Sequence, residues 1–287
     1  MANESGNRIA AQAEALGRTF ATELARVLRD ADRALRPILR AALDGDRSAQ
    51  SVAARGVAMR RHLRQALTGA GYDALVEAST MTAVERMSEA VLASRLTSRG
   101  VALMRPDPMK LRALAQLGQT NLLQVGDDVA GALWRSLSQW LFTVRDTDAI
   151  LADLADVFED EIGNLQTLFD TQVSIFGRQV EALATADAAA DQPFLYVGPV
   201  DALTREWCLD RVGKVYTRDV IEAMDNGQLA NPFLTGGGYS CRHSFIAVDS
   251  PELRALVNTG ERAPEFRMDV ARVHAAKELR RQRRRAA

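Results

Sequence analysis

Residues 150–183, "ILADLADVFEDEIGNLQTLFDTQVSIFGRQVEAL", decide the fold class of this chain. Apolar side chains recur there every three or four positions: Leu151, Leu154, Phe158, Ile162, Leu165, Phe169, Val173, Phe176, Val180 and Leu183. This spacing places them on one face of an α-helix, and Asp148 is a candidate cap for its first turn. The stretch predicts a helix of about 35 residues with a coiled-coil-like seam, which packs inside its own bundle or against another copy or a partner.

The sequence before this stretch has the same character. Helical spacing predicts helices at residues 9–43, 48–67, 74–95, 109–125 and 127–144. Pro37 is expected to kink or restart the first of them, because proline cannot donate the backbone hydrogen bond of a helix interior. Residues 1–190 are therefore predicted to form an elongated helical bundle, and the fold class is mainly α.

The sequence after residue 190 changes to a mixed pattern. "PFLYVGPV" (193–200) predicts a short strand and a turn, "TRDVIEAMDNGQ" (217–228) a capped helix, and residues 243–248 another strand. Residues 193–250 are thus expected to form a small α+β module, followed by a C-terminal helix and a basic tail at 251–287. Because a module of about 60 residues has a marginal core, we expect it to lean on the helical domain or on a metal.

Composition excludes several classes of protein. The formal net charge is −1, so no global field attracts nucleic acid or membranes. No apolar run approaches about 18 residues, and the polar N-terminal stretch does not have the pattern of a signal peptide. Two cysteines do not make a disulfide framework. We therefore expect synthesis in a cytoplasm and no segment that spans a membrane.

The candidate site lies in "LTGGGYSCRHSFIAV" (234–248). Cys208, Cys241 and His243 are candidate ligands of a structural zinc ion, with Asp201 or Asp210 as a conceivable fourth ligand. The same residues are compatible with two buried thiols beside a hydrogen-bonded histidine and no cofactor, or with a Cys208–Cys241 disulfide. A further alternative is a nucleophilic cysteine with His243 as its base, as in a cysteine hydrolase.

The three glycines before this cysteine are not a phosphate loop. Such a loop needs Lys and Ser or Thr at the start of a following helix, whereas a strand pattern follows Gly236, Gly237 and Gly238. The glycines instead predict a turn that requires positive φ angles.

The C-terminal tail contains five arginines: Arg280, Arg281, Arg283, Arg284 and Arg285. They are candidate contacts with the phosphates of DNA, which would make binding strongly dependent on salt. Docking on an acidic protein surface and a solvated tail are the alternatives.

Residues 194–248 contain an ordered set of distinctive positions: Asp201, Thr204, Arg205, Cys208, Gly213, Lys214, Asp225, Asn226, Gly227, Cys241, Arg242 and His243. In the order and spacing of these residues, the stretch resembles the C-terminal region of tailed-phage minor head proteins, the head-morphogenesis family typified by protein F of phage Mu. Ser240 stands where the family pattern has asparagine.

The resemblance implies a structural protein of the virion and not an enzyme. It implies a minor head protein at the portal vertex or in the head interior, which aids head assembly and DNA packaging or delivery. The implied partners are the portal protein, other head proteins and packaged DNA, and the implied state is an oligomer in the particle. Two different roles are also compatible with the sequence: a DNA-binding ejection protein that acts through its arginine tail, and a head-to-tail adaptor.

Overall fold

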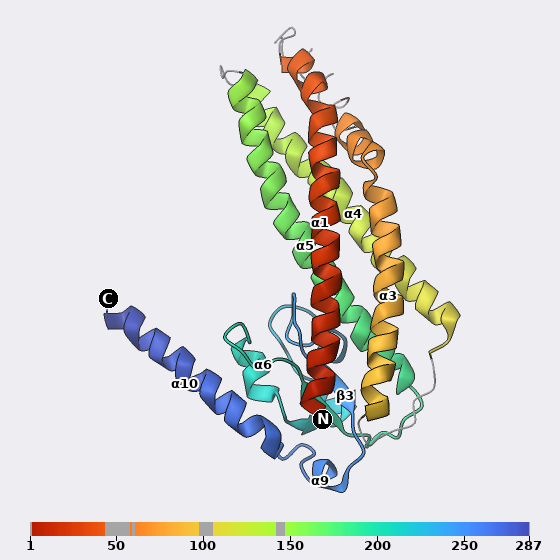
Figure 1. Ribbon diagram of the computed structural model, residues 1–287, viewed down its shortest axis with the longest axis vertical. Helices are drawn as coiled ribbons and strands as arrows, with labels where there is room; N and C mark the ends of the chain where they lie inside the picture. Colours follow the sequence, from red (N-terminus) through yellow and green to blue (C-terminus); the bar gives the residue numbers. More distant parts are fainter. Residues whose placement is uncertain (1, 44–57, 59–60, 98–105, 142–146, 287) are drawn as a thin grey trace. The chain divides into compact units, whose positions relative to one another are not determined.

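The computed structural model describes residues 2–43, 58, 61–97, 106–141 and 147–286, with backbone alone at some positions of the helices (Figure 1). It confirms a mainly α chain with a small C-terminal α+β part. The long helices are α1 (Ala2–Leu43), α3 (Tyr72–Thr97), α4 (Pro108–Leu141) and α5 (Thr147–Ala184), and residues 61–69 are also helical. Among the described residues, no helix combines the length and the apolar character needed to cross a membrane.

The apolar seam of α5 is buried wherever its side chains are described, except at its end. Leu165, Phe169, Val173, Phe176 and Val180 are each at most 1% exposed. This half of the seam therefore packs within the chain. Leu183 is half-buried, and the side chains of four earlier members lie outside the described set: Leu151, Leu154, Phe158 and Ile162.

Two expected interruptions are absent: a restart of the helix at Pro37 and a break at Gly126. α1 continues through Pro37 to Leu43, because Pro37 lies on the exposed face, where solvent can satisfy the carbonyl left without a donor. The two helices predicted at 109–125 and 127–144 are one helix, α4. The glycine between them, Gly126, packs against a tyrosine ring, and a Cβ at this position would lie 2.5 Å from Tyr72 Cε1. The start of the predicted helix 48–67 and the end of 127–144 lie outside the described residues.

The chain divides into two compact units. One consists of Gly17–Thr82 and Ala115–Phe169, and the other of Met1–Leu16, Ala83–Leu114 and Asp170–Ala287. All four boundaries fall inside long helices and not at the change of pattern near residue 190.

The unit made of Gly17–Thr82 and Ala115–Phe169, here called the helical unit, has an apolar core with few buried polar side chains among its described residues. The rings of Phe20 and Phe169 stack with centroids 3.9 Å apart. The Tyr72 hydroxyl is buried and donates to the carbonyl of Leu122 at 2.8 Å. Helical periodicity therefore accounts for most of this core.

The second unit contains a three-stranded antiparallel sheet in the order β2-β1-β3. The strands are β1 (Phe194–Val197), β2 (Val215–Tyr216) and β3 (Ser244–Ala247), and every residue of β1 and β3 is buried. The short helices around the sheet are α6 (Glu206–Arg211), α7 (Arg218–Glu222), α8 (Pro232–Thr235) and α9 (Pro251–Arg254). The last helix, α10 (Pro264–Ala286), begins beside the sheet and ends at the C-terminus (Figure 1).

The core of this sheet continues past residue 250. Ala263, Phe266 and Val270 belong to the same buried cluster as β1 and β3. Gly213 makes room for this packing, since a Cβ there would lie 2.6 Å from Phe266 Cβ. We therefore use the name C-terminal module for residues 194–270. The first turns of α10 provide part of the core that residues 193–250 lack.

Candidate metal centre

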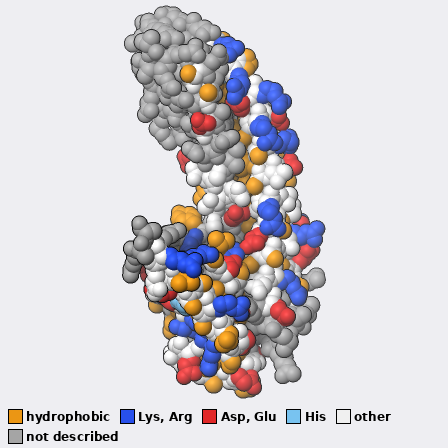
Figure 2. Space-filling view, turned by 60° about the vertical axis from the view of Figure 1, so that its left-hand side comes forward, with side chains coloured by type: hydrophobic (Ala, Val, Ile, Leu, Met, Phe, Trp, Pro, Cys, Tyr) orange, Lys and Arg blue, Asp and Glu red, His pale blue; other side chains and the backbone are white. Residues whose placement is uncertain are grey.

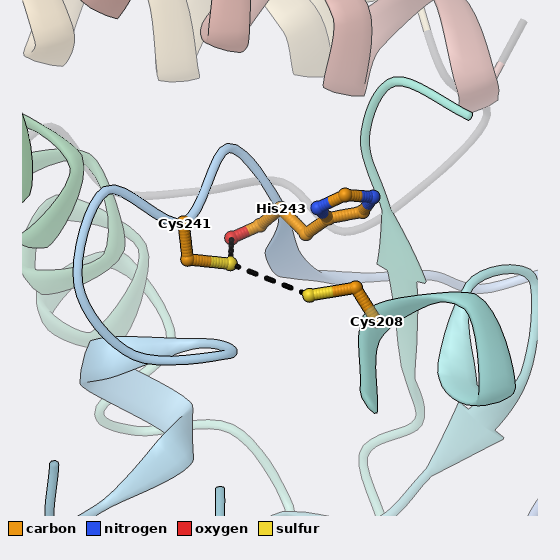
Figure 3. Close-up of side chains that lie close together, drawn as sticks. All are labelled: Cys208, Cys241 and His243. Atoms are coloured by element: carbon orange, nitrogen blue, oxygen red, sulfur yellow. Dashed lines mark hydrogen bonds between the residues drawn. The ribbon is translucent and has the colours of Figure 1, made fainter. Parts of the chain in front are cut away.

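Three short elements bring the candidate ligands together. Cys208 lies on α6, Cys241 follows the glycine turn, and His243 immediately precedes β3. Figure 3 shows the two sulfurs facing each other with the imidazole ring beside them. All three residues are buried, with at most 4% of their surface exposed.

The glycine turn has the predicted backbone and a further steric role. Gly236 and Gly238 have φ angles of 59° and 95°, which confirms the expected positive values. Gly237 is needed for space, because a Cβ there would lie 2.5 Å from Cys208 Sγ. Its amide also donates a hydrogen bond to Cys241 Sγ at 3.0 Å. The turn therefore wraps around the two sulfurs.

Charged residues of the motif tie its first and last parts together. The Arg242 guanidinium donates to both carboxylate oxygens of Asp201, at 2.6 and 2.8 Å. This hydrogen bonding lowers the pKa of Asp201 to about 2. Arg205 donates to the Gly237 carbonyl at 2.8 Å and also bonds the carbonyl of Tyr239. The Asp201–Arg242 ion pair and the hydrogen bonds of Arg205 together hold the start of α6 against the glycine turn.

The Asp-Asn-Gly turn closes on the same region. Asn226 Nδ2 donates to the Gly236 carbonyl at 2.8 Å, and Asn226 Oδ1 accepts from the Gln228 amide at 2.9 Å. Gly227 has a φ of 71°, which glycine adopts without strain. Asn226 thereby anchors residues 225–228 to the turn that carries Cys241.

The donor atoms suit a tetrahedral metal ion. The sulfurs of Cys208 and Cys241 lie 3.7 Å apart. A zinc ion with Zn–S bonds of about 2.3 Å holds two sulfurs about 3.8 Å apart. A ring nitrogen of His243 completes a group whose donor atoms all lie within 4.8 Å of one another. The cluster could therefore hold a metal ion.

His243 provides a second reason to consider an ion. Among the described residues, its buried Nε2 has no hydrogen-bond partner. A buried polar atom left unsatisfied costs about 1–3 kcal/mol, and the ring can turn either nitrogen toward a bound ion. The donor set of two thiols and one imidazole is the one that zinc prefers.

The prediction of Asp201 or Asp210 as a conceivable fourth ligand is wrong. Neither Asp201 nor Asp210 belongs to the group of donor atoms. Asp201 is held by Arg242 and also accepts from the Leu203 amide at 2.9 Å, whereas Asp210 is exposed. The Asp201 carboxylate thus fixes the turn before α6. Among the described residues, no carboxylate joins Cys208, Cys241 and His243 as a fourth donor.

The distances and the burial also bear on a disulfide and on a catalytic cysteine. Cys208 and Cys241 are not joined, since a disulfide needs a sulfur separation of about 2.0 Å. Cys241 and His243 are 4% and 2% exposed, so a substrate could not reach them without opening the module. This burial counts against a nucleophilic cysteine, which needs partial exposure.

The two thiols differ in their acid strength. A hydrogen bond from Cys208, together with His243 and the positive charge of Arg178, lowers the pKa of Cys241 well below its usual value, against the opposing effect of burial. The same hydrogen bond and burial raise the pKa of Cys208. Cys241 is therefore the first of the pair to become a thiolate, which is the form that binds metals.

Arg178 on α5 holds the turn at residues 241–243 through hydrogen bonds. It is 1% exposed, and it donates to the carbonyls of Cys241 at 2.6 Å and His243 at 2.7 and 2.9 Å. Three residues further along α5, Glu181 accepts the Ala247 amide at 2.8 Å. Two buried charged side chains of one helix thus position the turn and β3.

The three tail arginines whose side chains are described do not form one group. Arg281 pairs with Glu206 of α6 at 3.0 Å, and Glu206 also lies 3.4 Å from Lys277 Nζ. Arg280 and Arg283 are exposed. The side chains of Arg284 and Arg285 lie outside the described set. On the face drawn in Figure 2, Lys and Arg side chains are interspersed with acidic and apolar ones, without a continuous basic surface.

Sequence patterns did not single out Arg178 or Tyr196. Arg178 lies between two seam positions of α5, where helical spacing gives no sign that a charged side chain is buried. Tyr196 is one of four consecutive buried strand residues, so alternation gives no sign of its direction. No match to this chain was found among protein-family models, curated proteins or solved structures.

Proposed function

We propose that this chain is a structural protein of a tailed-phage head: a minor head protein at the portal vertex or in the head interior that aids head assembly and DNA packaging or delivery. The observation that carries the proposal is the network formed by the residues of the resemblance. Asp201 bonds Arg242, Arg205 bonds the glycine turn, and Cys208 contacts Cys241. Residues that match the family pattern at separate places in the sequence therefore form one connected network of contacts.

The burial of these residues supports a structural role over a catalytic one. The thiols and the imidazole are the most reactive side chains of the motif, and all three are inside the core. An enzyme would expose at least its nucleophile. The C-terminal module is then a rigid docking element for the portal or for other head proteins.

We also propose that Cys208, Cys241 and His243 bind a structural zinc ion. The ion would join α6, the turn at 241–243 and the start of β3, and would stabilise a module whose core is small. Metal content and free thiols should be measured together on chain purified under reducing conditions. About one zinc per chain is expected, with loss of zinc in Cys208→Ser and Cys241→Ser.

His274→Ala is the matched control for the zinc measurement, because His274 is exposed on α10. This variant should keep its zinc. A wild-type chain with two reactive thiols and no metal would contradict the zinc centre and leave the head-protein proposal standing.

The head-protein proposal is tested by assembly. The chain should be co-expressed with the portal protein and major head protein of the same phage, and the particles analysed by mass spectrometry. Incorporation of wild-type chain and of a chain lacking residues 280–287 is expected, because the module and not the tail makes the contacts. Absence from heads together with no complex with the portal protein would contradict it.

A second candidate function is DNA binding through α10. From His274 to Arg283 this helix is exposed at every position except Lys277, and Arg280 and Arg283 face solvent. Binding of duplex DNA should then weaken steeply with salt and disappear on deletion of residues 280–287. Equal binding by the truncated chain would exclude this candidate.

A further inference from the structure

Tyr196 is a buried residue beside the candidate metal centre. It lies in the middle strand of the sheet and is 0% exposed. Its hydroxyl oxygen is 3.4 Å from Cys208 Sγ and 3.6 Å from Cys241 Sγ. With the 3.7 Å between the sulfurs, the three atoms form a nearly equilateral triangle.

This triangle has the dimensions of one face of a zinc tetrahedron. Bonds of about 2.0 Å to oxygen and about 2.3 Å to sulfur place an oxygen about 3.5 Å from each sulfur, and two sulfurs about 3.8 Å apart. All three separations agree with these values to about 0.1 Å. The Tyr196 hydroxyl donates to Cys208 Sγ, whereas either atom can be the donor in its contact with Cys241 Sγ.

His243 lies beside this triangle. The imidazole and the phenol ring are stacked, with centroids 5.4 Å apart and planes inclined by 18°. A His243 nitrogen is within 4.8 Å of both sulfurs. Gly198 makes this stacking possible, since a Cβ there would lie 2.6 Å from His243 Cδ2. The oxygen and the nitrogen therefore approach the sulfurs from neighbouring groups.

The backbone holds Tyr196 in place. Its amide donates to the Lys214 carbonyl at 3.0 Å, and its carbonyl accepts from the Gly213 amide at 2.8 Å. On its other side it is in register with Phe245 of β3. A side chain on the central strand can therefore present its oxygen to the sulfurs with little loss of freedom.

We infer that the Tyr196 oxygen is the fourth ligand of the ion, which gives the centre two thiolates, one imidazole and one phenolate. This inference rests on the proposed zinc centre. It supplies the ligand that Asp201 and Asp210 do not provide. It also predicts a site closed by the protein, as four-ligand structural zinc sites are.

The test uses the full chain, freed of metal under reducing conditions and titrated with Co²⁺ and Zn²⁺. Wild type is expected to show the visible absorption of four-coordinate cobalt with thiolate ligands. Zinc should produce the ultraviolet difference spectrum of a metal-bound phenolate. Tyr196→Phe should lose that difference spectrum, change the cobalt spectrum and bind zinc about a hundredfold more weakly.

Tyr216→Phe is the matched control, because Tyr216 is half-buried on β2 of the same sheet and its ring contacts Phe245. It should keep both spectra and the affinity. Zinc binding with unchanged affinity and spectra in Tyr196→Phe would overturn the fourth ligand alone. No binding of either metal by wild type would overturn the zinc centre as well.

Discussion

The helical unit and the C-terminal module each bury a tyrosine, and the two tyrosines have different surroundings. The Tyr72 hydroxyl has a single backbone acceptor, the Leu122 carbonyl, among helices packed by apolar side chains. The Tyr196 hydroxyl faces two sulfurs in a core that also contains His243 and borders the buried Arg178. Burial raises the pKa of both phenols above their usual value.

The comparison separates two ways of stabilising a fold. Repeated apolar contacts along helices are individually replaceable, because each is one of many similar ones. The module depends on a few directional contacts that cannot substitute for one another. Substitutions in the module should therefore have more specific consequences than substitutions of equal size in the helical unit.

The largest effect is expected from metal removal. A chelator added to zinc-loaded chain should lower the protection of β1 and β3 amides in hydrogen exchange about ten-thousandfold, because an ion that binds only the folded form stabilises it by mass action. Amides of α1 after residue 17 should keep their protection. An equal loss of amide protection in the module and in α1 would contradict the proposed difference between the two regions.

Arg178→Met should have the next largest effect. It leaves the carbonyls of Cys241 and His243 without their buried donor, which we expect to lower the free energy of unfolding of the module by about 3–5 kcal/mol. The comparison variant is Leu28→Ala in the helical unit, with an expected loss of about 2–5 kcal/mol. Denaturant titration gives the two values, and zinc affinity should fall only in Arg178→Met.

Glycine substitutions give a smaller, graded test. Gly237→Ala places a methyl group against Cys208 Sγ, so a loss of about 1–3 kcal/mol and weaker zinc binding are expected. Gly227→Ala has no atom within 4 Å of the new Cβ and a φ of 71°, so only backbone strain of about 1 kcal/mol is expected. Unchanged zinc affinity in both variants would show that the turn tolerates the added volume.

The smallest effect is expected at Asp170 on α5. Burial, and then the charge of Glu14, raise its pKa from 3.8 to about 6. The ionised form is thus disfavoured in the folded chain, and the penalty is present above pH 6 and absent below about pH 4. Asp170→Asn should raise the free energy of unfolding at pH 8 by about 1 kcal/mol, after allowance for partial exposure, and leave it unchanged at pH 4. A gain of the same size at pH 4 would contradict this cause.

Much of the helical part was predictable. Apolar residues at intervals of three or four located α1, α3 and α5 to within a few residues, apart from the N-terminal end of α1, because burial of one helical face imposes that period. The same reasoning divided α4 at Gly126, since a glycine in a helical pattern does not reveal whether it breaks the helix or makes room for a ring.

The candidate site was predictable in its ligands and not in its support. Cys208, Cys241 and His243 could be named because thiols and imidazoles are rare in this chain and chemically distinctive. The choice of Asp201 or Asp210 as fourth ligand was wrong, because the conformation of the turn before α6 decides where a carboxylate points. Arg178 and Tyr196 reach the site from α5 and β1, and nothing in their local sequence records that approach.

The sequence by itself determined the class of the fold, the periodic core of its helices and the identity of three donor residues, since these depend on side-chain chemistry and on spacing along one element. Tertiary structure alone decided the distances between the donors, their burial and the elements that hold them. Those properties arise where α5, α6, the glycine turn and the sheet meet, and segments distant in the sequence acquire a common geometry only when the chain packs.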